Sequence, residues 1–347
     1  MIPRIRLPLL LAALALSGAG GAQAWGQEPT TEIVVDDPRI TESSGLSVSP
    51  TDPHLLYTIN DSGNDPVVFV IDRRSGDVVG TTALVGPDPD SHDIEALSVD
   101  DRGALWVADT GDNTNMRSDA ALYRLPAPGP GTATVTPQRF PLVYASGRPN
   151  IEALLIDQTA GRSWLVTKGF AGGQVLRLPN EMTPGQVVTP EPVTGVRVAG
   201  LVTDATVLPD GAAAVVRTYG EAQVYRLPSW ELVGSFRLPR QEQGESVTPL
   251  PNGQTLLAGS EGSPALIDVV PVPQRILDAL SADPTEPATP EPGAEPGVEA
   301  APSGAAPADD SGPLREGLTW VIGGGGALLL LAVALLVVRA RRSRADG

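Results

Sequence analysis

The stretch "DIEALSVDDRGALWVADTGDN", residues 93–113, contains two short apolar runs separated by "DDRG". Asp, Arg and Gly at the junction are typical of a tight turn, and the flanking runs have the length and composition of β-strands. The second run ends abruptly at Asp109, Gly111 and Asp112. The stretch therefore predicts an antiparallel hairpin whose second strand exits into a polar loop.

Four other segments repeat this order of an acidic residue, a strand, a turn and a second strand. They begin "ESSGLSVSP" at Glu42, "NIEALLIDQ" at Asn150, "VTDATVLPD" at Val202 and "GESVTPLPN" at Gly244. The acids that open the five units lie between 41 and 57 residues apart. Short antiparallel strands repeated at a period of about 40–55 residues are typical of a β-propeller.

The repeat predicts an all-β fold, a β-propeller with five blades. The fifth unit has no obvious fourth strand, and "TEIVVDDP", which begins at Thr31, could supply it and close the ring. A propeller of six blades would need a further unit within residues 126–148. An up-and-down barrel is the alternative architecture.

The repeat resembles known propeller families. "DIEALSVDDRGALWVADTGDNTNMR" is similar to the strand–turn–strand unit of NHL-type and WD40-like propellers, and "ESSGLSVSP" with "LLYTINDSG" resembles exported phytase-like and esterase-like propellers. A gluconolactonase-like enzyme would use a channel-facing Glu, Asn and Asp on one metal, and Glu42, Asn150 and Asp204 could take these parts. The blade count and the additional carboxylates depart from that pattern, and a phytase would want a basic patch that this sequence lacks.

The N-terminus has the three parts of a signal peptide, which we place at residues 1–24. Arg4 and Arg6 precede an apolar core, and Ala22-Gln23-Ala24 offers a cleavage site. The propeller ectodomain then spans residues 31–270. A segment rich in Pro, Ala and Glu at 271–317 cannot bury enough apolar surface to fold, and we expect a disordered stalk there.

Residues 318–338 form an uncharged apolar run that is long enough to cross a bilayer as a transmembrane helix. The tail at 339–347 contains four arginines and marks the cytoplasmic side. These features predict a single-pass protein of the cell membrane, with an extracellular N-terminal domain and a cytoplasmic C-terminus.

The charge is strongly negative, with 24 Lys and Arg against 41 Asp and Glu and a net charge of −17. Such a surface repels nucleic acid, which we exclude as a partner. The chain has no cysteine, so disulfides and thiolate chemistry are excluded.

The opening acids should gather at one mouth of the propeller channel, because each first strand lines the channel and the second strand returns beside it. Five pairs follow from this arrangement: Glu42 with Asp61, Glu95 with Asp109, Glu152 with Lys168, Asp204 with Arg217, and Glu245 with Glu261. Carboxylates at this density suit a cation, Ca²⁺ above all. The candidate metal ligands are Glu42, Asp61, Glu95, Asp109, Glu152, Asp204 and Glu245. Alternatively, each acid caps backbone N–H groups of its own blade.

Two functions remain open. The first is a non-enzymatic binding module for an extracellular protein, peptide or glycan, which the stalk and the lack of a catalytic set favour. The second is a Ca²⁺-dependent hydrolase or lactonase, for which His92 beside the carboxylates could act as a base. Apart from Ca²⁺, the sequence indicates no cofactor.

Overall fold

The computed structural model describes residues 30–61, 63–87, 92–113, 117 and 119–282 of the 347-residue chain. The predicted signal peptide, transmembrane helix and tail lie outside the described residues, as does the predicted stalk from residue 283 onward. Within the described part of the chain, no helix is long and apolar enough to cross a membrane.

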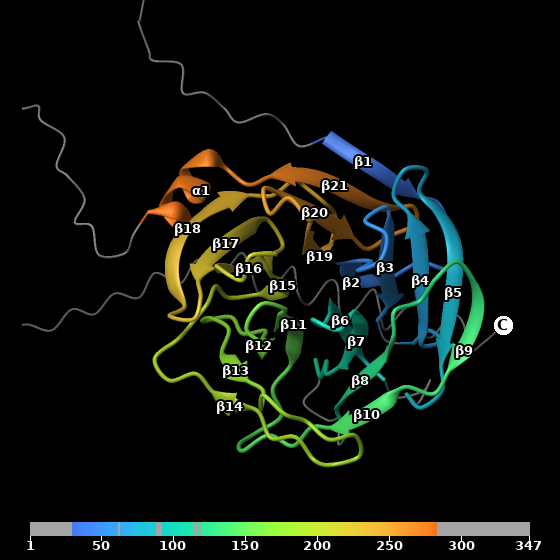
Figure 1. Ribbon diagram of the computed structural model, residues 1–347, viewed down its shortest axis with the longest axis horizontal. Helices are drawn as coiled ribbons and strands as arrows, with labels where there is room; N and C mark the ends of the chain where they lie inside the picture. Colours follow the sequence, from blue (N-terminus) through green and yellow to red (C-terminus); the bar gives the residue numbers. More distant parts are fainter. Residues whose placement is uncertain (1–29, 62, 88–91, 114–116, 118, 283–347) are drawn as a thin grey trace, which may run out of the picture. The chain divides into compact units, whose positions relative to one another are not determined.

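Five sheets stand around a common axis as the blades of a propeller (Figure 1). The first strand of each blade is innermost, and consecutive inner strands contact one another until the last meets the first. These inner strands are β2 (Ser43–Val48), β6 (Ile94–Val99), β11 (Ile151–Asp157), β15 (Val202–Val207) and β19 (Gly244–Pro249). The predicted all-β propeller of five blades is confirmed.

Each blade continues outward through antiparallel neighbours. Blade 1 adds β3 (Leu55–Asn60), β4 (Val67–Asp72) and β5 (Asp77–Leu84). Blade 2 adds β7 (Ala104–Asp109), β8 (Ala121–Pro126) and β10 (Gln138–Pro141). Blade 3 adds β12 (Arg162–Thr167), β13 (Val175–Arg177) and β14 (Glu191–Pro192). Blade 4 adds β16 (Ala213–Thr218), β17 (Glu221–Arg226) and β18 (Glu231–Arg237). Blade 5 adds β20 (Thr255–Ser260) and β21 (Ala265–Pro271).

The ring closes through the N-terminal strand. β1 (Thr30–Val35) pairs antiparallel with β21 and supplies the outer strand of blade 5, with Val35 opposite Ala265. The closure predicted from "TEIVVDDP" is therefore confirmed. Joining the two ends of the domain in one sheet removes the open edge that blade 5 would otherwise expose.

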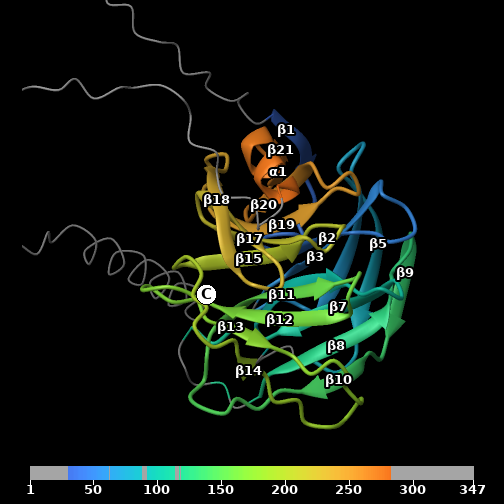
Figure 2. The ribbon, with the colours of Figure 1, turned by 60° about the vertical axis from the view of Figure 1, so that its left-hand side comes forward.

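The six-blade alternative is wrong within the described chain. The segment considered for a sixth blade forms two strands that belong to existing blades. One is β10, and the other is β9 (Gly131–Val135), which pairs in parallel with β5 at the outer edge of blade 1 (Figure 2). The β9 strand thus fastens blade 2 to blade 1.

Apolar side chains from neighbouring blades pack together in five buried clusters, one for each blade interface. The cluster between blades 2 and 3 includes Trp106 and Phe140 of blade 2, whose ring centroids lie 4.9 Å apart. Between blades 3 and 4, Trp164 and Trp230 meet edge to face at 5.7 Å. The two inner strands of every blade are buried on both faces, which explains why they read as continuous apolar runs.

The folded chain extends beyond the predicted boundary at residue 270. β21 ends at Pro271, and α1 (Gln274–Ser281) follows and packs on β18 (Figure 1). Ile276 of this helix is buried. Arg226 donates hydrogen bonds to the carbonyls of Ala279 at 2.6 Å and Leu280 at 3.0 Å, near the C-terminal end of the helix. Ile276, Leu277 and Leu280 form a short apolar stripe at helical spacing that lies inside a Pro- and Ala-rich composition.

Candidate functional site

Each inner strand ends at a turn, so counting back from the turn identifies equivalent positions in the five blades. The turns begin at Ser49, Asp100, Asp157, Leu208 and Leu250. The residues five positions before them are, in the same order, Ser44, Glu95, Glu152, Thr203 and Glu245. Each inner strand carries a β-bulge at or next to this position. Bulges redirect a side chain at the rim of a sheet. Three of the five positions hold glutamate.

The loops at this end of the blades repeat one backbone hydrogen bond. The N–H of the residue after the second strand is bonded to the carbonyl of the residue before the first strand. Four blades show it, at 2.9 to 3.0 Å: Asp61 to Glu42, Thr110 to Asp93, Lys168 to Asn150 and Glu261 to Gln243. We call the group formed by Glu42, Asp61, Asp93, Glu95, Glu152, Lys168, Glu245 and Glu261 the acidic mouth.

Lys168 is the cation of the acidic mouth and the only lysine in the sequence. Its Nζ lies 3.0 Å from Oε2 of Glu152, whose Oε1 accepts a hydrogen bond of 2.5 Å from Asn150. The ammonium also lies 5.6 Å from the ring centroid of Tyr219. The predicted pairing of Glu152 with Lys168 is therefore present in the structure.

The other carboxyls of the mouth repel one another. Burial and the charges of Glu42 and Glu261 raise the pKa of Asp61 to about 9. Burial and the charges of Glu245 and Glu42 raise the pKa of Glu261 to about 8. For Glu245, burial and Glu152 raise the pKa to about 7 against the opposing effect of Lys168. At neutral pH the mouth therefore holds protons that a cation would displace.

Glu95 is a buried carboxyl of the mouth. Burial, followed by the charges of Glu152 and Asp93, raises its pKa well above the usual value. Gly111 leaves the space for it, because a Cβ on Gly111 would lie 2.2 Å from Oε1 of Glu95 and 2.6 Å from Oδ2 of Asp93. The glycine of "ADTGDN" thus permits the two carboxyls to lie against the loop backbone.

Asp109 has partners of its own. Arg117 donates a hydrogen bond of 2.5 Å to its Oδ1, and the backbone N–H of Asp93 donates to the same oxygen at 2.9 Å. Asp109 is thereby a neutralised cap at the end of β7. This geometry agrees with the capping interpretation, and it was not visible in the sequence because Arg117 lies eight residues away.

Asp204 and Arg217 are register partners across β15 and β16, but they do not belong to the acidic mouth. The Asp204 carboxylate accepts the N–H groups of Ala205 and Val247, each at 2.7 Å. Arg217 is completely buried and donates to the carbonyl of Gly259 at 2.9 Å. In blade 4 the bulge residue is Thr203, so Asp204 is displaced by one position toward blade 5.

No group of three or more Asp, Glu or His side chains within the described ranges is arranged to hold a metal ion. The carboxyls of the mouth are spread around a ring, and Asp109 and Asp204 are already engaged by protein donors. No chemical step is derived through a metal. Ca²⁺ binding stays a prediction.

Apolar side chains border the acidic mouth on the side of blades 3 and 4. Phe170 is 83% exposed, Tyr219 is 40% exposed and Leu201 is 37% exposed. Leu201 has a φ of 57°, a strained conformation for a branched side chain. Its N–H is bonded to the carbonyl of Gly169, which places it beside the loop that carries Phe170. We call Phe170, Leu201 and Tyr219 the apolar rim.

The acidic mouth includes Asp93, which sequence reasoning paired only with His92, while it missed the apolar rim altogether. His92 is buried close to the charges of Asp93 and Asp109. Asp93 and Glu42 each lie seven residues before the turn of their own blade. Counting back from the turns would therefore have identified them as equivalent positions of the repeat. No sequence signal singles out Phe170, which lies on a loop without a repeat.

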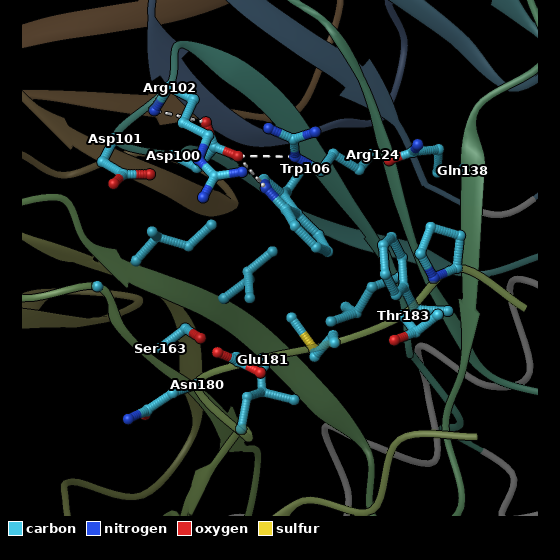
Figure 3. Close-up of a pocket in the computed structure, with 18 of the residues that line it drawn as sticks. Asp100, Asp101, Arg102, Trp106, Arg124, Gln138, Ser163, Asn180, Glu181 and Thr183 are labelled. Carbon is cyan, nitrogen blue, oxygen red and sulfur yellow. Dashed lines mark hydrogen bonds and ion pairs between the residues drawn. The ribbon is translucent and has the colours of Figure 1, made fainter. Parts of the chain in front are cut away.

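A cavity of about 660 Å³ opens between blades 2 and 3 (Figure 3). Three of its polar side chains are bonded to one another. The Oδ2 of Asp100 accepts hydrogen bonds from Trp106 Nε1 at 2.9 Å and Arg124 Nε at 2.7 Å, and Oδ1 accepts the N–H of Ala104. This cluster fastens the turn of blade 2.

No protein-family model and no curated protein sequence matches the chain. Solved structures share its architecture. A gluconolactonase from Xanthomonas campestris is 15% identical, with a TM-score of 0.41 over 70% of this chain and 88% of that chain. A luciferin-regenerating enzyme is 12% identical, with a TM-score of 0.42 over 66% and 78%. The Cps50 (Swd1) propeller domain of Myceliophteria thermophila is 13% identical, with a TM-score of 0.40 over 70% and 99%. These likenesses concern the fold alone.

Proposed function

We propose that the chain is an exported, membrane-tethered binding module, and that its acidic mouth receives a basic segment of an extracellular protein or peptide. The observation that carries the proposal is the cluster of seven carboxyls that act electrostatically on one another, with Lys168 paired to Glu152, next to an exposed apolar rim. Exposed apolar side chains beside a charged surface are typical of sites for protein partners. The signal peptide and membrane helix expected from the sequence place this face outside the cell.

A cationic partner would reduce the electrostatic repulsion among the carboxyls of the acidic mouth. Asp61 and Glu261, with pKa values of about 9 and 8, are largely protonated at neutral pH, so each contributes little charge before a ligand arrives. An arginine or lysine side chain placed among them lowers these pKa values and releases protons. Binding should therefore be accompanied by proton release and should tighten as the pH rises from about 6 to 9.

The apolar rim would select for the residues that flank the basic residue in the bound partner. The ring centroid of Tyr219 lies 5.6 Å from Nζ of Lys168, so the apolar rim adjoins the acidic mouth. Phe170 and Leu201 extend the apolar surface outward. A basic residue followed by an aromatic or aliphatic residue fits this arrangement, because the ring can bury apolar area while the charge enters the mouth.

The test uses the full-length chain in detergent and isothermal titration with the peptide Gly-Arg-Trp-Arg-Gly. Its matched control carries citrulline for arginine, which keeps the shape and removes the charge. We expect the arginine peptide to bind and the citrulline peptide to bind at least about tenfold more weakly. Equal affinity for the two peptides, or no binding by either, would overturn the proposal.

Three variants locate the site. The double substitution Glu42→Gln with Glu261→Gln should weaken binding about tenfold or more, whereas Glu231→Gln, at an exposed position on β18, should leave it unchanged. Lys168→Met should tighten binding, because it removes the competing cation. Weakening by Glu231→Gln as strong as that of the double variant would point to unspecific attraction.

The second candidate is a hydrolase or lactonase. The observation in its favour is the pKa of Glu245, about 7, within the range suited to general acid–base catalysis. Titration of the same chain with Ca²⁺, followed by lactone and ester hydrolysis assays, tests it. A Ca²⁺-dependent rate that disappears in Glu245→Gln would establish the enzyme, and no rate above that of buffer would exclude it for these substrates.

A further inference from the structure

The channel has a second opening at the opposite end of the inner strands, where the turns lead into the second strands. It is a cavity of about 310 Å³ lined by residues from all five blades. No Asp, Glu, Lys, Arg or His side chain lines it. The two ends of the channel therefore differ completely in charge, although they are built from the same five strands.

Hydroxyl groups recur at one register position around this opening. The residue two positions before each turn is Ser47, Ser98, Thr206 or Thr248 in four blades, and all four line the cavity. In blade 3 the equivalent is the buried Leu155. We call these four residues the hydroxyl ring. Hydroxyls therefore recur at one position of the inner strands, just as glutamates recur at another position in the acidic mouth.

Within the described chain, the hydroxyls of this ring make no hydrogen bonds to protein groups. Neighbouring hydroxyls do, for example Ser43 to Thr58 at 2.6 Å and Tyr57 to Ser49 at 2.8 Å. Ser47 and Thr248 are only 6% and 5% exposed, so little of their surface is open except toward the cavity. Half-enclosed hydroxyls without protein partners are available to donate to and accept from a ligand.

Apolar surface alternates with the hydroxyls. Val48, Val99 and Val207 follow three members of the hydroxyl ring along their strands, and Pro50, Pro209 and Pro251 stand at the turns. The lining thus combines groups that both donate and accept hydrogen bonds with flat C–H surfaces, and it carries no formal charge.

We infer that this opening is a binding site for a neutral saccharide. A pyranose presents hydroxyls around its edge and C–H groups on its faces, which matches a ring of free hydroxyls interleaved with valine and proline. The cavity volume lies at the lower end of the range of small-ligand sites and suits one or two sugar units. This inference is independent of the acidic mouth and of the function proposed for it.

Other ligand classes fit less well. An ion would find no countercharge, and a purely apolar ligand would leave the hydroxyls desolvated without partners. Proline-rich peptides are recognised in grooves lined by aromatic side chains, and none lines this cavity. The chain's own Pro-rich segment is therefore not the occupant that the lining favours.

The test is saturation-transfer NMR and calorimetry on the full-length chain in detergent. The probes are glucose, galactose, mannose and N-acetylglucosamine, their methyl glycosides, and short neutral oligosaccharides. Saturable binding of a free monosaccharide identifies a soluble sugar as the ligand, and binding of oligosaccharides alone identifies the end of a glycan chain. Either result supports the inference. No saturable binding by any probe at tens of millimolar would overturn it.

The double substitution Thr206→Val with Thr248→Val removes two hydroxyls and keeps the side-chain shapes. We expect it to weaken sugar binding at least about tenfold while the circular dichroism spectrum and the melting temperature stay close to those of the parent. Thr134→Val, at an exposed position on β9, is the matched control and should bind normally. Unchanged affinity in the double variant, or displacement of the sugar by a peptide copying residues 284–313, would contradict the assignment.

Discussion

The carboxylate of Asp204 in β15 accepts the backbone N–H of Val247 in β19 at 2.7 Å and so joins blade 4 to blade 5. Its other oxygen accepts the N–H of Ala205, also at 2.7 Å. Asp204 is completely enclosed, and burial raises its pKa against these hydrogen bonds. Because inner strands of a propeller are not hydrogen-bonded to each other in a sheet, a side chain that bridges two of them has a disproportionate effect on ring closure.

Asp204→Asn should therefore destabilise the protein by about 1–3 kcal/mol, because one backbone N–H would face an amide NH₂ in place of an acceptor. The urea midpoint of the full-length chain measures this. Asp210→Asn is the control. Asp210 is exposed in the turn of the same blade, and an amide oxygen can still accept the N–H of Ala212. Equal midpoints for the two variants would show that the Asp204 bridge does not stabilise the fold.

Sequence periodicity was sufficient for the blades because the two inner strands of each blade are buried on both faces, and each turn has distinctive residues. The register of the site was harder to predict. In "VTDATV" the bulge falls on Thr203, and both Thr203 and Asp204 are polar, so the pattern cannot show which of them takes the glutamate position. Non-local contacts were also hidden, such as the parallel pairing of β9 with β5 and the ion pair of Arg117 with Asp109.

Gly111→Ala should displace carboxyls of the acidic mouth, because Gly111 lies against the side chains of Glu95 and Asp93. The new Cβ would lie 2.2 Å from Glu95 Oε1, so either the carboxyl or the loop backbone must move. We expect a loss of about 1–3 kcal/mol in the free energy of unfolding, as for other overpacked sites. Gly129→Ala is the matched control, since a Cβ there meets no atom within 4 Å. Thermal denaturation of both variants, compared with the parent, gives the answer, and equal shifts would refute the close contact.

Glu245 should make stability depend on pH in the neutral range. Its pKa is about 7 in the folded protein and near 4.5 when unfolded, so the folded state binds the proton more tightly. The resulting stabilisation is complete below pH about 4.5 and disappears as the pH rises through 7. Glu245→Gln should raise stability at pH 8 by about 2 kcal/mol relative to the parent and have little effect at pH 4.5.

Urea denaturation of the Glu245→Gln variant across this pH range provides the measurement. Glu231→Gln, on the exposed outer strand of blade 4, should leave the parent's profile unchanged. If Glu245→Gln and the parent lose stability equally between pH 4.5 and 8, then Glu245 does not titrate in this window.

Lys168→Met should leave the buried Glu152 carboxyl without its counter-charge. Lys168 Nζ lies 3.0 Å from Glu152 Oε2, and the Glu152 side chain is 2% exposed. We expect a loss of about 2–3 kcal/mol at pH 8. The loss should become smaller at pH 5, because without the lysine the pKa of Glu152 rises further and the carboxyl then folds in its neutral form.

A double-mutant cycle separates this pair from the rest of the mouth. Adding Glu152→Gln to Lys168→Met should restore most of the stability at pH 8, since the buried negative charge is gone and the amide can still accept a hydrogen bond from Asn150. Additive losses in the double variant would mean that the two side chains stabilise the fold independently, and the acidic mouth would then not be a coupled electrostatic unit.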